Sequence, residues 1–357
     1  MARRRRQGDA DPVGAACYFL RTGGAACRKS HTSLAEAGLV VVAVPEGDTA
    51  TVEAVYAALV EAADDGHRPH LGASLIGREC ARDIWYVWRW ATRGVQDGRV
   101  LRLFRHGQDE ERRLAEDLRL AGVTVVDRTD DGRQWSFSDL GGHFGGSMDG
   151  AVLGLLEAPK AWHVWECKTA NTRAFAAIRK NGVEKEKPEH WVQMQCYMHW
   201  SGMERAYYTV VNKDSDEIYA ERVRYDRSAA LAAIDRARGI IESREPPPYI
   251  NERPMYYLCK SCQHRGVCRE GLPPLTHCRT CAFSEARLDG DGRWHCALQH
   301  KNLSLEEQRA GCAQYRVISG LEAREQEDVE KLMAVFGART IESTVDDEGD
   351  PDDPLTF

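Results

Sequence analysis

The alternation of apolar and polar positions divides the chain into helical and extended stretches separated by glycine and proline. Helical spacing covers residues 51–63, 110–121, 190–201 and 228–243, and a further helix-like stretch begins near Ser74 and contains Cys80. Extended character covers residues 39–44, 123–128, 134–138, 145–156, 162–169, 205–212 and 218–225. The four strands within residues 123–169 predict an antiparallel meander. The whole order predicts an α/β core with one mixed sheet flanked by helices.

Changes in texture along the chain predict four regions. Residues 1–67 form an N-terminal segment to which we attach no chemistry, and residues 68–256 form the core. Residues 257–320 are loop-rich and cysteine-dense, and residues 321–357 suit a helix followed by an acidic, disordered tail. A small cysteine-rich region with few apolar residues normally depends on a bound metal.

Composition narrows the class of protein. With 43% hydrophobic residues, 29% charged residues and a mean hydropathy of -0.51, the 357 residues predict a soluble globular chain. The longest apolar run, residues 38–45, is far shorter than the roughly 20 residues of a membrane helix. Twelve cysteines without an export signal predict a reducing, cytoplasmic location, where cysteine clusters bind metals more often than they form disulfides.

The net charge of -7 does not exclude a nucleic-acid ligand, because the acidic excess is local. From Glu342 onward the chain carries seven acidic residues and no basic one, so the remainder has a balance of -7 + 7 = 0. Positive charge is concentrated in Arg3 to Arg6. We interpret this run as a flexible cationic end, and contact with nucleic acid is the alternative.

Acidic residues at a strand and at a turn before it predict a metal site. If residues 162–169 form a strand, Val164, Glu166 and Lys168 share one face, while Cys167 points to the other face and the core. A hairpin would bring Asp149 beside them. Two carboxylates with open positions between them suit Mg²⁺ or Mn²⁺, and a neighbouring lysine can orient water or neutralise charge on a phosphate. Alone, an Asp-Gly pair is usually a turn, and Glu-X-Lys on a strand is usually an exposed ion pair. The metal site is predicted because both motifs occur here in order, with a hairpin between them.

These motifs resemble the PD-(D/E)XK nuclease superfamily, in particular the phage-type, RecB-like exonucleases. Asp149 corresponds to the motif II aspartate, and Glu166-Cys167-Lys168 fits the (D/E)XK motif. Residues 103–111 look like the family's first helix, whose glutamate we assign to Glu111, with Glu110 as the competitor. The resemblance implies a restriction-endonuclease-like core in which Glu111, Asp149 and Glu166 bind Mg²⁺ or Mn²⁺ and Lys168 acts on the water.

Further segments extend the resemblance from about residue 70 to residue 223. Gln193 and Tyr197 match the Gln-X-X-X-Tyr signature of the RecB-like branch and lie one turn apart on a helix, where the resemblance implies contact with DNA. His106 precedes Gly107, whereas the metal-binding histidine of some relatives follows the equivalent glycine. Residues 162–188 carry a basic excess that suits phosphate contacts, although exposed loop charge is the simpler interpretation.

The resemblance implies a DNA nuclease, and an exonuclease of phage or prophage recombination or repair is the preferred subtype. The reaction would be direct phosphodiester hydrolysis. A phage recombination protein or a single-strand-binding protein is an implied partner, and no membrane is involved.

Cysteine spacing adds two metal sites to this picture. Cys259-X2-Cys262-X5-Cys268 lacks a fourth ligand, and in iron-sulfur nucleases of this superfamily that ligand is a distant upstream cysteine. By this resemblance Cys80 completes a [4Fe-4S] site that clamps the entry of the core to its exit.

The remaining C-terminal cysteines, Cys278, Cys281, Cys296 and Cys312, form a zinc-ribbon-like set suited to tetrahedral Zn²⁺. Three histidines are alternative ligands: His277, His295 and His300. Cys278 is also an alternative fourth ligand of the first group. We interpret Cys17, Cys27, Cys167 and Cys196 as ordinary thiols.

Two other classes of protein compete with the nuclease. One is a non-catalytic, zinc-ribbon DNA-binding protein with a relic nuclease fold, which gives no reason for keeping Asp149, Glu166 and Lys168 together. The other is an iron-sulfur redox protein, which leaves the acidic motif unexplained and has no flavin or nucleotide fingerprint.

Overall fold

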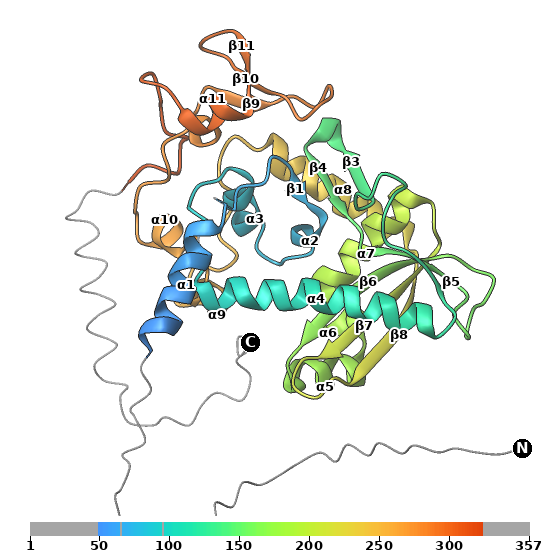
Figure 1. Cartoon of the computed structure of the whole chain (residues 1–357). Helices are drawn as coiled ribbons and strands as arrows, with labels where there is room; N and C mark the ends of the chain where they lie inside the picture. The colour runs from blue at the N-terminus through green and yellow to red at the C-terminus, as the bar shows by residue number, and fades with distance from the viewer. Residues whose placement is uncertain (1–48, 65, 95, 324–357) are drawn as a thin grey trace, which may run out of the picture. The chain divides into compact units, whose positions relative to one another are not determined.

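A computed structural model describes residues 49–64, 66–94 and 96–323 (Figure 1). The described residues from Ala50 onward belong to one compact unit. Several sequence predictions lie outside the described residues: the strand at 39–44, the cationic end, Cys17, Cys27, and the helix and acidic tail beyond residue 323.

A mixed five-stranded sheet forms the centre of the unit, with strand order β2-β5-β6-β7-β8. Its strands are β2 (Thr124–Val126), β5 (Gly150–Leu153), β6 (His163–Ala170), β7 (Arg205–Asn212) and β8 (Ile218–Arg224). β6 and β7 run parallel, and the other neighbours run antiparallel. The mixed central sheet is therefore confirmed. β6 and β7 are largely buried because helices cover both of their faces.

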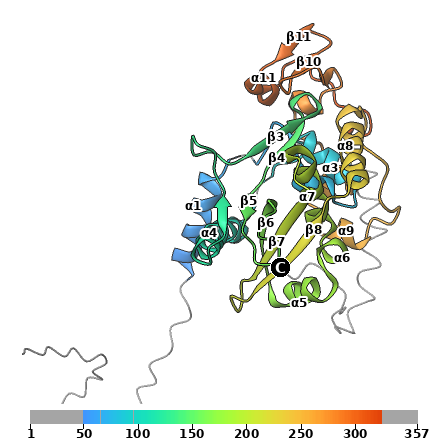
Figure 2. The ribbon, with the colours of Figure 1, turned by 90° about the vertical axis from the view of Figure 1, so that its right-hand side faces the viewer.

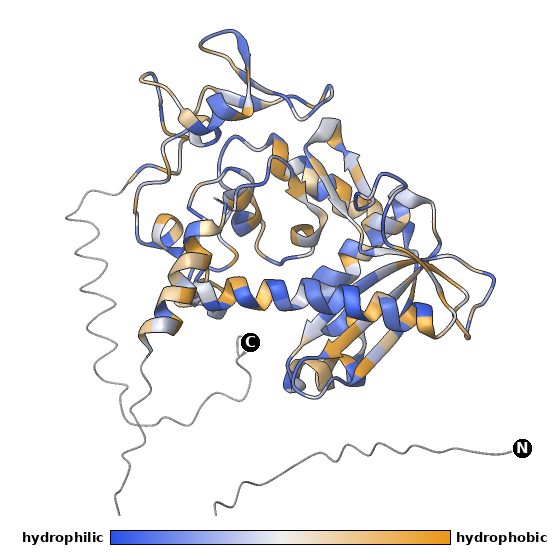
Figure 3. Cartoon of the chain, in the orientation of Figure 1, coloured by the Kyte–Doolittle hydropathy of each residue, from blue (hydrophilic) through white to orange (hydrophobic). Residues whose placement is uncertain are grey.

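The two faces of the central sheet pack against different helices (Figure 2). On one face, α4 (Gly98–Leu120) packs Leu114 and Ala115 against Val152 and Trp165. On the other face, α7 (Pro188–Ser201) packs beside α6 (Val183–Glu186), which in turn contacts α5 (Thr172–Asn181). Apolar and polar bands alternate along α4, as an amphipathic helix requires (Figure 3).

A second, three-stranded sheet contains β1 (Leu71–Gly72), β4 (Phe144–Ser147) and β3 (Ser136–Asp139) in the order β1-β4-β3. β4 pairs parallel with β1 and antiparallel with β3. The predicted continuous strand 145–156 and the single meander were wrong, because the chain changes sheet between β4 and β5. Gly145 permits this close pairing, since a Cβ there would lie 2.2 Å from the Phe137 carbonyl oxygen.

Two predicted helix boundaries were also wrong. The helix-like stretch from Ser74 is two helices, α2 (Ala73–Ile76) and α3 (Ala81–Trp88), and Cys80 caps the second because its Sγ accepts a hydrogen bond from the Asp83 amide. α4 begins at Gly98 rather than residue 110, with Asp97 as its N-cap. It ends at Leu120, before Gly122, which adopts a φ of 84° as predicted for its position.

Other helices agree more closely with the sequence. α1 (Ala50–Ala62), α7 and α8 (Arg227–Glu242) lie within two residues of their predicted bounds. The helices α5 and α6 occupy a basic stretch for which no helix was predicted. A short 3-10 turn, η1 (Leu140–Gly142), links β3 to β4.

The cysteine-rich region contains short elements: α9 (Tyr257–Lys260), α10 (Arg265–Arg269), η2 (Cys278–Thr280) and α11 (Leu305–Ala310). Three short strands form its antiparallel sheet, in the order β11 (Lys301–Leu303), β10 (Trp294–Cys296) and β9 (Ser284–Ala286). Among the described residues, no helix has both the length and the apolarity needed to cross a membrane.

Candidate active site and cysteine clusters

The candidate active site lies where β6 extends beyond its neighbour β5. The pairing of the two strands begins at Gly150 opposite Trp165, so the next part of β6 has no strand on that edge. Asp149, the residue before β5, takes that place: its Oδ2 accepts a hydrogen bond of 2.8 Å from the Cys167 amide. The backbone therefore fixes one carboxylate beside the middle of β6.

Glu166 and Lys168 lie on the same face of β6, as the alternation of side chains predicts. Glu166 is completely buried, and its Oε1 accepts a contact from the Lys168 ammonium. Its other oxygen, Oε2, is buried without a hydrogen-bond partner among the described residues. Cys167 points to the opposite face and packs in the apolar cluster under α4, which agrees with its expected role as an ordinary thiol.

α4 brings Glu111 to this cluster and directs Glu110 elsewhere. Burial and the negative charge of Asp149 raise the pKa of Glu111 to about 7, although Arg128 and Lys168 oppose the rise. Glu110 is 5% exposed and pairs with Arg113 at 3.1 Å. Of the two candidates for the helix glutamate, Glu111 is therefore the one whose charge interacts with the cluster.

The side chains of the cluster perturb one another strongly. Burial, followed by the charge of Asp149, raises the pKa of Glu166 to about 8 against the opposing effect of Lys168. Burial also raises the pKa of Asp149. Burial alone would lower the pKa of Lys168, but Glu166 and Asp149 raise it above its ordinary value. Lys168 is therefore protonated, and the carboxylates repel one another.

These features fit a divalent cation. An ion would give the buried Glu166 Oε2 a partner and offset the repulsion among three carboxylates, and hard cations prefer such oxygen ligands. Within residues 49–323, gaps excepted, no three histidine, cysteine or acidic side chains are arranged to hold a metal ion as they stand. Here the Lys168 ammonium contacts Glu166, so binding an ion requires these side chains to rearrange.

The predicted DNA contacts on α7 are buried. Gln193 is 5% exposed and Tyr197 is 2% exposed. Gln193 Nε2 donates to the Tyr197 hydroxyl at 3.2 Å, and that hydroxyl donates to the Ser147 carbonyl at 2.8 Å. Both side chains thus face the turn before Asp149. His106 is exposed on α4.

Two residues near the cluster were not singled out from the sequence. Arg128, just after β2, interacts electrostatically with Glu111. His190 on α7 interacts with Lys168, and its Nδ1 lies 2.8 Å from the Tyr208 hydroxyl. The spacing of His190, Gln193 and Tyr197, at i, i+3 and i+7, would have indicated a shared helix face.

The basic stretch after β6 forms α5 and α6, not the loop considered from the sequence. Part of its charge is already paired, because Arg179 contacts Glu217 at 3.4 Å and Lys187 contacts Glu189 at 3.8 Å. Lys180 and Lys185 are exposed.

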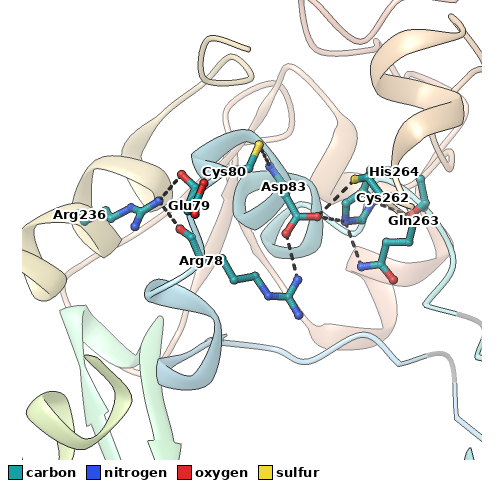
Figure 4. Close-up of polar contacts among 9 residues, drawn as sticks. Arg78, Glu79, Cys80, Asp83, Arg236, Cys262, Gln263 and His264 are labelled. Atoms are coloured by element: carbon teal, nitrogen blue, oxygen red, sulfur yellow. Dashed lines mark hydrogen bonds and ion pairs between the residues drawn. The ribbon is translucent and has the colours of Figure 1, made fainter. Parts of the chain in front are cut away.

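Two members of the first cysteine group, Cys80 and Cys262, lie near Asp83 at the start of α3 (Figure 4). Asp83 connects two of its members: the Asp83 amide donates to Cys80 Sγ at 3.4 Å, and Cys262 Sγ donates to Asp83 Oδ1 at 3.6 Å. Cys268 interacts electrostatically with both Cys262 and Cys259. The chain therefore brings Cys80 and Cys262, about 180 residues apart in sequence, to the same aspartate.

The second cysteine group gathers around η2. Burial first, then the neighbouring Cys281, Cys312 and Cys296, raise the pKa of Cys278 to about 11. The other three cysteines of the group are therefore close enough to act electrostatically on the Cys278 thiol. Cys278 Sγ also donates to the Glu307 carbonyl at 3.4 Å.

Two histidines considered as alternative ligands make other contacts. His277 Nε2 lies 2.8 Å from the Trp90 carbonyl, and His295 Nδ1 lies 3.2 Å from Asn302 Oδ1. His300 has a φ of 51° in the turn before β11.

Comparison with known proteins finds partial likeness to exonucleases. No family model and no curated protein matches the chain. The alkaline exonuclease LHK-Exo from Laribacter hongkongensis, solved alone and in complex with dAMP, is 18% identical, with TM-scores of 0.34 and 0.36, over 53% of this chain and 90% of that chain. A phage related exonuclease from Haemophilus somnus 129PT is 12% identical, with a TM-score of 0.32, over 45% of this chain and 77% of that chain. We therefore infer the function from the side chains of this chain.

Proposed function

We propose that this protein is a divalent-metal-dependent nuclease that hydrolyses phosphodiester bonds in DNA. The observation that best supports this proposal is the convergence of Asp149, Glu166 and Glu111 with Lys168 at the open edge of β6. Burying several acids around one ammonium is unfavourable unless a ligand compensates. A relic fold without catalysis would have no reason to retain this arrangement, so we favour an active enzyme.

The acidic residues of the cluster would bind the metal ion, and Lys168 would act on the water and the phosphate. When bound, Mg²⁺ or Mn²⁺ would polarise the scissile phosphate as a Lewis acid. Asp149 and Glu166 would hold the ion, with Glu111 in support. The protonated Lys168 would orient the attacking water and neutralise negative charge that develops on the phosphate. Water attack on phosphorus and departure of the opposite oxygen require no covalent enzyme intermediate.

The preferred subtype is an exonuclease of phage or prophage DNA recombination or repair, acting in the cytoplasm. It rests on the order of motifs in the sequence, from the helix glutamate to the Gln-X-X-X-Tyr pair. A phage recombination protein or a single-strand-binding protein would be its partner.

The nuclease proposal is tested by incubating the purified chain with linear DNA and Mg²⁺ or Mn²⁺. We expect Glu166→Ala and Lys168→Ala each to reduce DNA degradation by about 100-fold or more, because each removes a charge that acts in the transition state. Lys160→Ala is the matched control, since this exposed lysine in the turn between β5 and β6 lies outside both the cluster and the basic stretch. Equal degradation by the wild type and both cluster variants would refute the assignment.

The assignment of the helix glutamate has its own test. Glu111→Gln should reduce cleavage and weaken Mn²⁺ binding, because its carboxylate interacts with Asp149 and Lys168. Glu110→Gln should instead affect stability, since Glu110 pairs with Arg113 away from the cluster. The reverse pattern in a Mn²⁺ titration would exchange the roles of the two residues.

We further propose that Cys80, Cys259, Cys262 and Cys268 bind a [4Fe-4S] cluster. The proximity of Cys80 and Cys262 to Asp83 supports this set, and four thiolates are the usual ligands. Protein purified without oxygen should be brown and contain iron and acid-labile sulfide, and Cys259→Ala should lose both. Colourless anaerobic protein that contains only zinc would contradict the proposal.

We propose Zn²⁺ as the ligand of Cys278, Cys281, Cys296 and Cys312. The electrostatic effect of Cys281, Cys296 and Cys312 on Cys278 supports a shared site, and four thiolates suit Zn²⁺. Elemental analysis should find zinc in the wild type, and Cys281→Ser should lose zinc while keeping iron. Loss of iron instead from Cys278→Ser would assign that cysteine to the first group.

A further inference from the structure

We propose that Tyr197 and Gln193 are positioning residues that hold Asp149 in place, and that they do not bind DNA. This inference rests on the proposed function, because it concerns the carboxylate that would bind the metal. It revises the role that the sequence resemblance implies for the pair. The argument starts from burial: with exposed fractions of 2% and 5%, neither side chain offers a surface to a DNA strand.

The Tyr197 hydroxyl is committed to the backbone that leads to Asp149. It donates to the Ser147 carbonyl at 2.8 Å and receives a hydrogen bond from Gln193 Nε2 at 3.2 Å. Burial raises the pKa of Tyr197 above its ordinary value, and the nearby charge of Glu166 adds to this, so the hydroxyl keeps its proton and remains a donor. Ser147 is the last residue of β4 and lies two residues before Asp149.

The close packing of Tyr197 on this strand requires a glycine. A Cβ on Gly146 would lie 2.8 Å from the Tyr197 hydroxyl oxygen and 3.2 Å from a ring carbon. Any larger residue would therefore push the ring away from Ser147. This requirement explains one glycine of the Gly145-Gly146 pair that precedes the acidic motif.

The short segment from Ser147 to Asp149 is fixed at three points. The Tyr197 hydroxyl holds the Ser147 carbonyl, and the Met148 amide donates to the Trp135 carbonyl at 3.0 Å while its side chain is buried. The Asp149 carboxylate accepts from the Cys167 amide at 2.8 Å. Without the hydroxyl, one of these points is lost: the Ser147 carbonyl loses its donor, and the buried Gln193 amide loses its acceptor.

Loss of the Tyr197 hydroxyl should therefore weaken metal binding. Groups that orient a metal ligand typically change metal affinity or activity by about 10- to 100-fold when they are removed. A residue that contacts DNA changes DNA affinity instead. The two roles therefore predict different measurements on the same variant.

The test compares Tyr197→Phe with the wild type in two binding assays. Mn²⁺ affinity is measured by isothermal titration calorimetry without DNA, and DNA affinity is measured by fluorescence anisotropy in EDTA. We expect Tyr197→Phe to bind Mn²⁺ about tenfold or more weakly and to bind DNA as the wild type does. Tyr225→Phe is the matched control, because it removes a half-buried hydroxyl that hydrogen-bonds to His199 at 2.7 Å, away from the cluster. It should change neither affinity.

Gly146→Ala provides a second variant that retains the hydroxyl, and it carries the test if Tyr197→Phe does not fold. It should weaken Mn²⁺ binding in the same direction, because the added methyl group displaces Tyr197. Weaker DNA binding with unchanged Mn²⁺ affinity would overturn the inference, as would variants that match the wild type in both assays. A wild-type chain that binds no Mn²⁺ would contradict the proposed function itself, which separates the two failures.

Discussion

His143 is completely buried, and its two ring nitrogens have different surroundings. Nε2 lies 3.0 Å from the Arg287 carbonyl and 3.1 Å from the Arg293 carbonyl, so it carries the proton and donates to both. Nδ1 is buried without a partner among the described residues. A second proton on this ring would therefore be a desolvated charge, and burial lowers the pKa of His143 to about 4.

This lowered pKa predicts a loss of stability in mild acid. In the unfolded chain the histidine protonates near pH 6.5, whereas in the folded chain it resists protonation until about pH 4. The unfolded state thus binds more protons across this window, and the free energy of unfolding decreases as the pH falls. Between pH 7.5 and pH 5 the contribution of this group should decrease by about 2 kcal/mol.

His143→Gln separates this effect from other acid-sensitive groups, because the amide keeps a donor for the two carbonyls but does not titrate. Urea denaturation of both proteins at pH 7.5 and pH 5 should show the larger loss in the wild type. Equal losses would mean that His143 is protonated in the folded protein as easily as in the unfolded one.

At the residue scale, the sequence could predict the acidic cluster because its parts are local. Strand alternation alone places Glu166 and Lys168 on one face and Cys167 on the other. The burial of Gln193 and Tyr197 could not be predicted. Polar and apolar residues are mixed around α7, so its sequence does not show which face packs against β4. The partner of the Tyr197 hydroxyl, Ser147, lies 50 residues away.

At the element scale, α4 connects the candidate site to α1. Its first residue, Gly98, lies directly under Tyr56 of α1, where a Cβ would be 2.4 Å from the Tyr56 Cα. Hydrophobic periodicity did not predict the first three turns of α4, because they are rich in arginine and include two glycines; the family resemblance indicated a helix only from residue 103. Packing against α1 and the Asp97 cap provide stability that the local pattern does not indicate.

Two glycine substitutions on this helix should therefore have opposite effects. Gly98→Ala should destabilise the protein by about 1–3 kcal/mol, because the backbone of α1 must move away. Gly107→Ala should stabilise it by about 0.5–1 kcal/mol, because alanine favours helix and the nearest atom, Thr169 Oγ1, is 4.0 Å from the added Cβ. Thermal unfolding measures both, and hydrogen exchange should be faster in α1 only in Gly98→Ala.

The division of the strands between two sheets is the main feature of the elements that the sequence did not predict. Their approximate positions were predicted from local alternation and turn residues. Which strands pair depends on contacts between distant segments, such as β1 with β4, and local patterns do not report these. The break at Met148 and Asp149 is short, so residues 145–156 resemble one strand.

At the scale of the whole molecule, two buried arginines join the cysteine-rich region to the core. Arg279 is 1% exposed and donates to the Trp88 and Pro69 carbonyls at 3.3 and 2.8 Å. Its guanidinium lies 3.8 Å from the centre of the Trp90 ring. Arg89 donates back to the Arg279 carbonyl at 3.3 Å. Neither has an acidic partner within the described part of the chain, so carbonyls and aromatic rings compensate for their burial.

Arg279→Ala should therefore destabilise the protein by about 3 kcal/mol or more, since it leaves buried carbonyls unpaired and a cavity beside Trp90. Arg287→Ala is the control from the same region. It removes only a surface pair with Glu285 and should cost about 1 kcal/mol or less. Chemical denaturation distinguishes them, and similar small losses for both would show that the two regions are joined by other contacts.

The arginine contacts also constrain when the protein can fold during its synthesis. The carbonyls of Pro69 and Trp88 are synthesised 210 and 191 residues before Arg279, which donates hydrogen bonds to them. At roughly 5–20 residues per second, that interval lasts on the order of 10 to 40 s. Until it ends, two tryptophans near the start of the fold, Trp88 and Trp90, lack the Arg279 guanidinium that packs on their rings. Completion of the fold therefore awaits translation of the cysteine-rich region, and a chaperone bound to the nascent chain would be expected to engage these aromatic residues in the meantime.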